Sequence, residues 1–119
     1  MDEKPIHWVG TSKMGLLRLP AEVVHDIGYA LHVVQNGGHP PTARVWKGLG
    51  PGIYELAEYD ACGTFHLVYS LQLARAVYVL HVFQKKSPSG IRTSRNDIGL
   101  IRRRLSAALA DYEVRYGGK

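Results

Sequence analysis

The sequence predicts one α+β domain over residues 1–119, in which an N-terminal short strand and two helices precede an antiparallel β-meander and a C-terminal helix. Apolar residues recur every three or four positions in 21–35 and again in 96–112, which is the spacing of amphipathic helices. Between these segments lie three β-rich runs, at 53–59, 64–70 and 76–85. A chain of 119 residues is the size of one ordinary domain.

The N-terminal elements follow from local signals. Residues 6–9 are β-rich and predict a short edge strand. Ser12 is expected to cap a short helix that ends at Leu17. Pro20 suits the first turn of the next helix, because its missing N–H has no helical partner there. That helix ends at residues 36–38, where two glycines permit left-handed closure. Its apolar face is expected to comprise Val24, Ile27, Leu31 and Val34.

The middle of the chain is read as connections between strands. Residues 39–42 contain two prolines and predict a rigid linker, and the three glycines of 46–52 predict a sharply turning loop. This loop lacks the Gly-Lys-Ser/Thr ending of a phosphate-binding loop and precedes no helix, which excludes a nucleotide cradle. Asp60 and Gly63 suit a tight turn between the first two meander strands, while 71–75 make a looser connection.

Alternation along the meander separates two faces. In the second strand Phe65 and Leu67 point to one face and His66 to the other. The third strand is apolar on both faces, so it is expected to be central, with His81 as a hydrogen-bonded interior imidazole. The last helix is expected to begin at a cap formed by Ser94 or Asn96. Its predicted apolar face comprises Ile98, Ile101, Leu105, Ala108, Leu109 and Tyr112.

Composition narrows the function classes. Only one cysteine is present, which excludes an internal disulfide, and no His, Cys, Asp and Glu residues stand at metal-ligand spacing. We expect a cytoplasmic protein with no cofactor, no metal and no membrane span. The net charge is +5, and it divides unevenly: residues 1–74 sum to −2 and residues 75–119 to +7. A concentrated basic part attracts nucleic acid, although a solvated basic face without a partner remains the alternative.

Ordered blocks of sequence carry a family resemblance over about residues 6–110. The strongest block is the run Phe-Gln-Lys-Lys-Ser at 83–87, directly after an apolar strand. It follows a Trp-Lys-Gly-Leu-Gly turn at 46–50, a Tyr-Glu strand from residue 53, and the motif Phe-His-Leu-Val-Tyr at 65–69. In this order the blocks resemble the phage-derived, HigB-like branch of the RelE/ParE toxin superfamily.

The resemblance implies a compact α/β toxin of a type II toxin–antitoxin system. Most RelE-like members cut mRNA on the ribosome without a metal, and the expected partner is a cytoplasmic helix-turn-helix antitoxin that forms a hetero-oligomer with the toxin. ParE-like members instead inhibit DNA gyrase. A non-toxic, phage-derived accessory protein is a third reading, since Glu55 and Ala57 stand where RelE-like members carry lysines.

The same resemblance identifies candidate catalytic residues. Cleavage of RNA by its own 2′-OH needs a base, an acid for the leaving 5′-oxygen and cations for the charged phosphate. His66 stands where RelE-like members carry a phosphate-binding arginine, Lys86 where they carry a charge-stabilising arginine, and Arg92 roughly where they carry a late tyrosine. Glu55 or Glu58 is an alternative base, unless it pairs with a neighbouring Lys or Arg.

RNA-binding residues are expected around these positions. Arg44 and Lys47 flank the glycine-rich loop, and Lys85 precedes Lys86. Together with Arg95, these cations are expected to line one basic groove. Trp46 and Tyr54 are candidates for stacking on bases, with core packing as the alternative for both.

Overall fold

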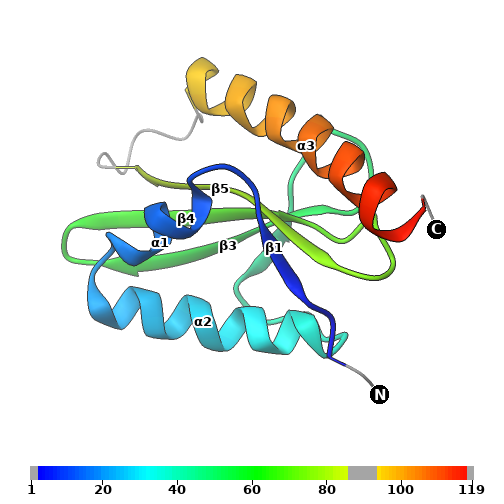
Figure 1. The fold of residues 1–119 in the computed structure, drawn as a ribbon. Coiled ribbons are helices and arrows are strands. Elements are labelled where there is room, and N and C mark those ends of the chain that lie inside the picture. Colours follow the sequence, from blue (N-terminus) through cyan, green and yellow to red (C-terminus); the bar gives the residue numbers. More distant parts are fainter. Residues whose placement is uncertain (1–2, 86–93, 118–119) are drawn as a thin grey trace.

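The computed structural model describes residues 3–85 and 94–117 of the chain, and it confirms the α+β class (Figure 1). Its elements, in chain order, are β1 (Ile6–Trp8), α1 (Ser12–Leu17), α2 (Ala21–Gln35), β2 (Ala43–Val45), β3 (Ile53–Asp60), β4 (Gly63–Ser70), β5 (Val77–Lys85) and α3 (Arg95–Tyr116). Within this described part, no helix combines the length and apolarity needed to cross a bilayer.

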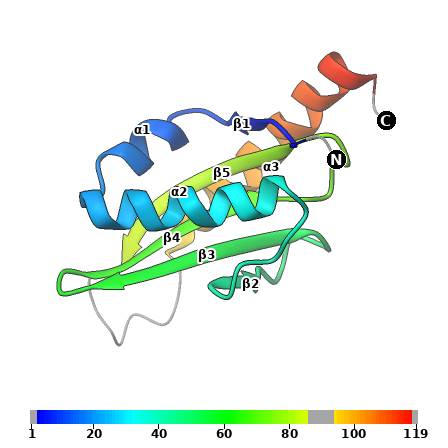
Figure 2. The same cartoon turned by 90° about the horizontal axis from the view of Figure 1, so that it is seen from below.

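The strands form one mixed sheet in the order β1-β5-β4-β3-β2. β3, β4 and β5 are the predicted antiparallel meander, and β1 pairs parallel with β5 at one edge (Figure 2). The tight turn between β3 and β4 is confirmed: the Asp60 carboxylate accepts a 2.7 Å hydrogen bond from the Cys62 N–H, and Gly63 has a φ of 136°. A side chain is strained at that φ, so glycine suits this position.

Helices cover both faces of the sheet. α1 and α2 pack on one face, which we call the α2 face, and α3 packs on the other, the α3 face (Figures 1 and 2). The α2-face core includes Ile27, Leu31, Val34, Phe65, Leu67, Tyr69 and Val79. The α3-face core includes Ile53, Val68, Tyr78, Leu80, Ile101, Leu105 and Tyr112. β4 alternates between the two cores, as its sequence predicts.

Three local expectations were wrong, and the core alternative for Tyr54 is confirmed. Ser12 is the first helical residue rather than the cap, and its buried hydroxyl donates to the Val79 carbonyl at 3.2 Å. Residues 43–45 form the edge strand β2, which pairs with β3 and was not expected, because three residues are too few for a periodic signal. Leu109 is 44% exposed, so it does not belong to the buried face of α3. Tyr54 stacks on Tyr69 in the α2-face core, which is the core alternative.

Candidate functional site

His66 lies on the α3 face of the sheet, opposite to Phe65 and Leu67, as predicted. It pairs in register with Ala57 of β3 and with Phe83 of β5, so it is held in the interior of the sheet rather than at an edge. The residue is 8% exposed, although histidine was expected to be accessible at this position. A buried imidazole in a strand has a defined orientation, which a catalytic group requires.

Glu55 is the partner of His66. Its Oε2 lies 3.2 Å from His66 Nδ1, and the two side chains are 17% and 10% exposed. A carboxylate at this place accepts the Nδ1 proton and leaves the lone pair on Nε2. The Nε2 atom is buried and has no hydrogen-bond partner among the described residues. Glu58, the alternative base, lies in register with Phe65 and therefore on the α2 face, away from His66.

An aromatic ring joins His66 to a second histidine. The Phe83 ring stacks on His66 with centroids 5.1 Å apart and on His81 with centroids 5.3 Å apart, at interplanar angles of 14° and 19°. Trp46 meets the same Phe83 ring edge-on, with centroids 6.5 Å apart. Trp46 thus packs against the α3-face core, which is the alternative to base stacking.

A β-bulge brings His81 to this face. Val68 pairs with His81 and Tyr69 pairs with Val79, so Leu80 is the extra residue. Strict alternation would place His81 on the same side as Val79, which faces α2, whereas the extra residue turns it toward α3. The ring lies between strand and helix, as expected for a hydrogen-bonded interior histidine.

His81 is hydrogen-bonded through both ring nitrogens. Its Nε2 lies 2.6 Å from Asp97 Oδ1, and its Nδ1 lies 3.5 Å from Arg104 Nη1. Ser94 caps α3 by accepting from the Asp97 N–H at 3.1 Å, and its hydroxyl donates to Asp97 Oδ2 at 2.6 Å. Burial raises the pKa of Asp97, but the hydrogen bonds from Ser94 and His81, with the positive charge of His81 and Lys85, outweigh it and lower this pKa below its ordinary value.

The predicted cations are partly brought together. Arg44 of β2 pairs in register with Glu55 of β3, and Lys85 of β5 pairs with Thr64 of β4. Lys85 therefore lies on a strand next to that of His66, whereas Arg44 lies two strands away. Lys47 is exposed in the loop after β2, and Arg95 is the exposed first residue of α3. Lys86 and Arg92 lie outside the described residues.

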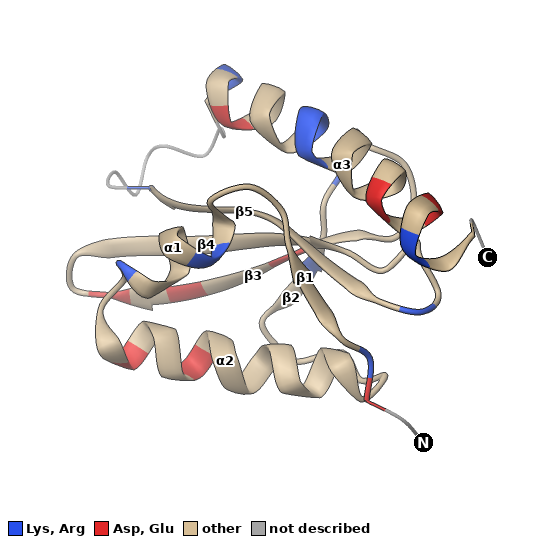
Figure 3. Ribbon diagram, viewed as in Figure 1, with Lys and Arg blue, Asp and Glu red and all other residues tan. Residues whose placement is uncertain are grey.

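The two long helices, α2 and α3, differ in their charged residues. Glu22 and Asp26 of α2 are accompanied by no Lys or Arg on that helix (Figure 3). α3 carries five arginines along its length, and Arg44 and Lys85 lie on strands of the sheet that it covers. In the part of the chain that the structure describes, no group of three His, Cys, Asp or Glu side chains gathers at metal-binding distance.

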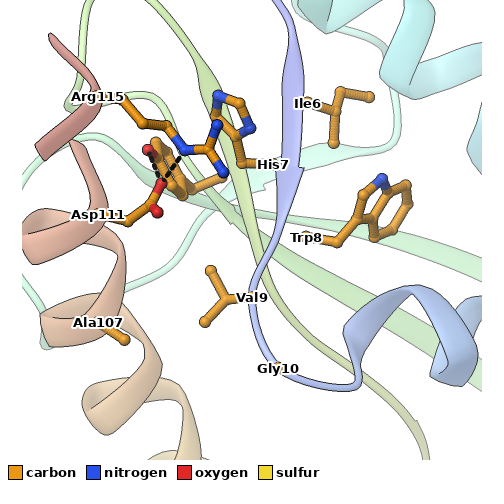
Figure 4. Close-up of a pocket in the computed structure, with 9 residues that line it drawn as sticks. Ile6, His7, Trp8, Val9, Gly10, Ala107, Asp111 and Arg115 are labelled. Atoms are coloured by element: carbon orange, nitrogen blue, oxygen red, sulfur yellow. Dashed lines mark hydrogen bonds and ion pairs between the residues drawn. The ribbon is translucent and has the colours of Figure 1, made fainter.

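A separate pocket lies between β1 and α3 (Figure 4). It has a volume of about 480 Å³. The Tyr78 hydroxyl donates to Asp111 at 2.6 Å, and Arg115 Nε donates to the same carboxylate oxygen at 2.7 Å. Burial, followed by the adjacent Asp111, raises the pKa of Tyr78. This network ties β5 to the C-terminal half of α3, and none of the predicted site residues lines the pocket.

The sequence signals captured only part of the site. His66 was identified by its motif and Glu55 as one of two possible bases. Phe83 lies in the Phe-Gln-Lys-Lys-Ser run but was given no role of its own, and Asp97 was not among the candidate site residues. The contacts of Phe83 and Asp97 depend on the register between strands and on the bulge in β5. The pattern of residues along a single strand does not reveal either of these.

Comparison with known proteins gives one result. The sequence model of the family described as phage derived protein Gp49-like matches residues 14–106, which is well over half of the chain. The match includes β2 to β5 and the first half of α3, and therefore the whole His66 site. No curated protein matches the chain.

Proposed function

The chain belongs to the phage-derived Gp49-like family, and from this premise we propose that it is the toxin of a type II toxin–antitoxin system that cleaves mRNA on the ribosome. The observation that carries the nuclease proposal is the Glu55–His66 pair. In this pair a partly buried carboxylate orients an imidazole whose Nε2 has no partner within residues 3–85 and 94–117. Unsatisfied buried polar atoms are rare in proteins, and they are often found at catalytic positions.

In the proposed reaction His66 is the general base. Its Nε2 takes the proton of a ribose 2′-OH, the 2′-oxygen forms a bond to phosphorus, and the bond from phosphorus to the 5′-oxygen breaks. A second group protonates the leaving 5′-oxygen. Glu55 is the positioning residue, because it holds the proton on Nδ1 and stabilises the imidazolium that forms.

Cationic side chains stabilise the charge on the phosphate in this proposal. Lys85 lies on the strand next to that of His66, and Arg44 is in register with Glu55, the partner of His66. We also assign Lys86 and Arg92 to this role, on the resemblance alone. Lysine offers a point charge and arginine a planar fork, so Arg44 is the better candidate for holding phosphate oxygens in a fixed geometry. In this proposal the protein side chains carry out the reaction without a metal ion bound to the protein.

The partner in this proposal is a helix-turn-helix antitoxin that covers the basic surface and keeps the toxin inactive in the cytoplasm. Purification of the untagged pair from its own operon tests this partner: a stable hetero-oligomer is expected. A toxin that purifies alone from cells that grow normally contradicts it.

Induction of the chain without its partner, followed by mapping of transcript ends, tests the function. Growth arrest with new 5′ ends inside translated mRNA is expected for the wild type, and neither is expected for His66→Ala. Arrest with intact transcripts and blocked DNA supercoiling indicates a ParE-like gyrase inhibitor instead. Normal growth indicates a phage accessory protein.

A further inference from the structure

A small cationic pocket lies beyond the end of β1. It is enclosed by α1, β5 and α3 and has a volume of about 270 Å³. β1 pairs only with Val77–Val79 of β5, so the next residues of β5 have no strand at this edge. Arg18, His81 and Arg104 line the pocket, and no acidic side chain does. Drug-sized ligands occupy about 300–1,000 Å³, so a pocket of this size suits a single small group.

Arg104 reaches the pocket in a fixed orientation. Its Nη1 donates to the Leu80 carbonyl at 3.0 Å, and its Nη2 donates to Thr11 Oγ1 at 3.0 Å. His81, which is itself held by Asp97, contacts Nη1 from the other side. A guanidinium has five N–H groups, and these three contacts leave two of them without a partner among the described residues.

Arg18 supplies a second guanidinium to the same pocket. It follows α1 as the C-cap residue, its side chain is exposed, and none of the ion pairs of the described residues includes it. Thr11 is also exposed and keeps its hydroxyl proton, because its oxygen accepts from Arg104. Two planar cations and a hydroxyl around one small cavity match the oxygens of a phosphate group.

The pocket is adjacent to the candidate active site. His81 forms one wall of it, and the other neighbour of His81 is the Phe83 ring that stacks on His66. The Phe83 ring therefore lies between the His66 imidazole, where the scissile linkage is proposed to bind, and His81, which lines the pocket. An RNA strand held at His66 carries further phosphates on both sides of that linkage.

We propose that the pocket formed by Thr11, Arg18 and Arg104 binds a neighbouring phosphate of the RNA strand whose scissile linkage lies at His66. This inference rests on the proposed function for the identity of the ligand. An RNA backbone and free inorganic phosphate both present a phosphate group, so inorganic phosphate is the competing ligand for this pocket.

The test measures binding of a short single-stranded RNA in which every ribose is 2′-O-methylated, so that no cleavage occurs. The variant is Arg18→Ala, and the matched control is Lys13→Ala, which removes one exposed cation from the same helix outside the pocket. For single strands, each phosphate contact contributes roughly 0.7 to the slope of log K against log salt concentration. We expect Arg18→Ala to lower that slope by roughly this amount and to weaken binding equally for different RNA sequences.

Two further measurements sharpen the result. Arg18→Lys keeps the charge, so we expect it to retain the salt dependence. Titration of inorganic phosphate, followed by amide chemical shifts at Thr11 and Gly15, distinguishes the sources of the ligand. The RNA assignment is overturned if free phosphate shifts these amide signals while Arg18→Ala leaves the salt dependence of RNA binding unchanged. Equal slopes for Arg18→Ala, Lys13→Ala and the wild type also overturn it.

The outcome is separable from that of the proposed function. If mRNA cleavage depends on His66 but RNA binding is unchanged by Arg18→Ala, the proposed nuclease function is supported and the pocket is refuted as an RNA-binding site. If Arg18→Ala weakens binding of the methylated RNA but the wild type does not cleave unmodified mRNA, the pocket is supported as an RNA-binding site and the nuclease function is refuted.

Discussion

Replacing Glu55 by glutamine tests the central pair of the candidate site. The substitution keeps the size and polarity of the side chain but removes the charge that lies 3.2 Å from His66 Nδ1. Because a glutamine amide can donate to Nδ1 as well as accept from it, the proton is no longer confined to that nitrogen. The tautomer with the proton on Nε2 cannot act as a base toward the 2′-OH.

The size of the effect follows from the strength of the lost contact. A hydrogen bond to a charged group contributes about 1.5–3 kcal/mol. At about 1.36 kcal/mol per tenfold change in rate, this predicts a roughly 10- to 150-fold slower cleavage. The free energy of unfolding should change by only about 1 kcal/mol, since the amide still bonds to the ring and a partly buried charge is removed.

Single-turnover cleavage of a reporter mRNA on purified ribosomes measures this effect, with urea denaturation as the stability readout. Glu58→Gln is the matched control, because Glu58 is on the same strand but the opposite face. If Glu55 acts only through His66, the double variant Glu55→Gln with His66→Ala should cleave no more slowly than His66→Ala alone. Wild-type cleavage by Glu55→Gln would refute the role of the pair.

Three further predictions concern stability in urea. Tyr78→Phe should lower the free energy of unfolding by about 1–2 kcal/mol, because it removes the 2.6 Å hydrogen bond to Asp111; an unchanged midpoint would contradict this. Asp97→Asn should destabilise the protein at pH 7, and the difference from wild type should shrink as the pH falls below 3.8, because Asp97 has a lowered pKa and loses its stabilising charge there; a difference constant down to pH 3 would count against it. Gly63→Ala should cost about 1–3 kcal/mol at its φ of 136°, and its Cβ would lie 2.7 Å from a backbone oxygen of β5; a neutral result would show that this turn relaxes.

Local pattern was sufficient for most of the fold and for the placement of His66. The alternation of β4 assigned its faces, because the strand pleat alternates side chains without exception from Phe65 to Val68. The helices α2 and α3 were placed by their apolar spacing, with ends shifted by only a few residues. β2 was missed because its three residues gain their strand conformation from pairing with β3.

The remainder of the site depends on contacts between distant segments. Leu80 lies at the bulge, and in a regular strand without the bulge His81 would point to the same face as Val79, toward α2. No composition signal marks that residue, since it is an ordinary apolar member of a β-rich run. Glu55 lies 11 positions before His66, so their pairing required the register of the hairpin as well as its turn.

The two histidines on the Phe83 ring differ in their hydrogen bonds. His81 has a partner at each nitrogen, Asp97 and Arg104, and its contacts join β5 to α3. Among the residues that the structure describes, His66 has a partner at Nδ1 and none at Nε2. Leaving a buried polar atom unpaired costs about 1–3 kcal/mol, a large fraction of the roughly 5–15 kcal/mol that stabilises a domain. An apolar side chain at position 66 would avoid this cost and still pack against Phe83. Under the proposed function the bound RNA supplies the missing partner of Nε2, which is why the base is assigned to His66 rather than to His81.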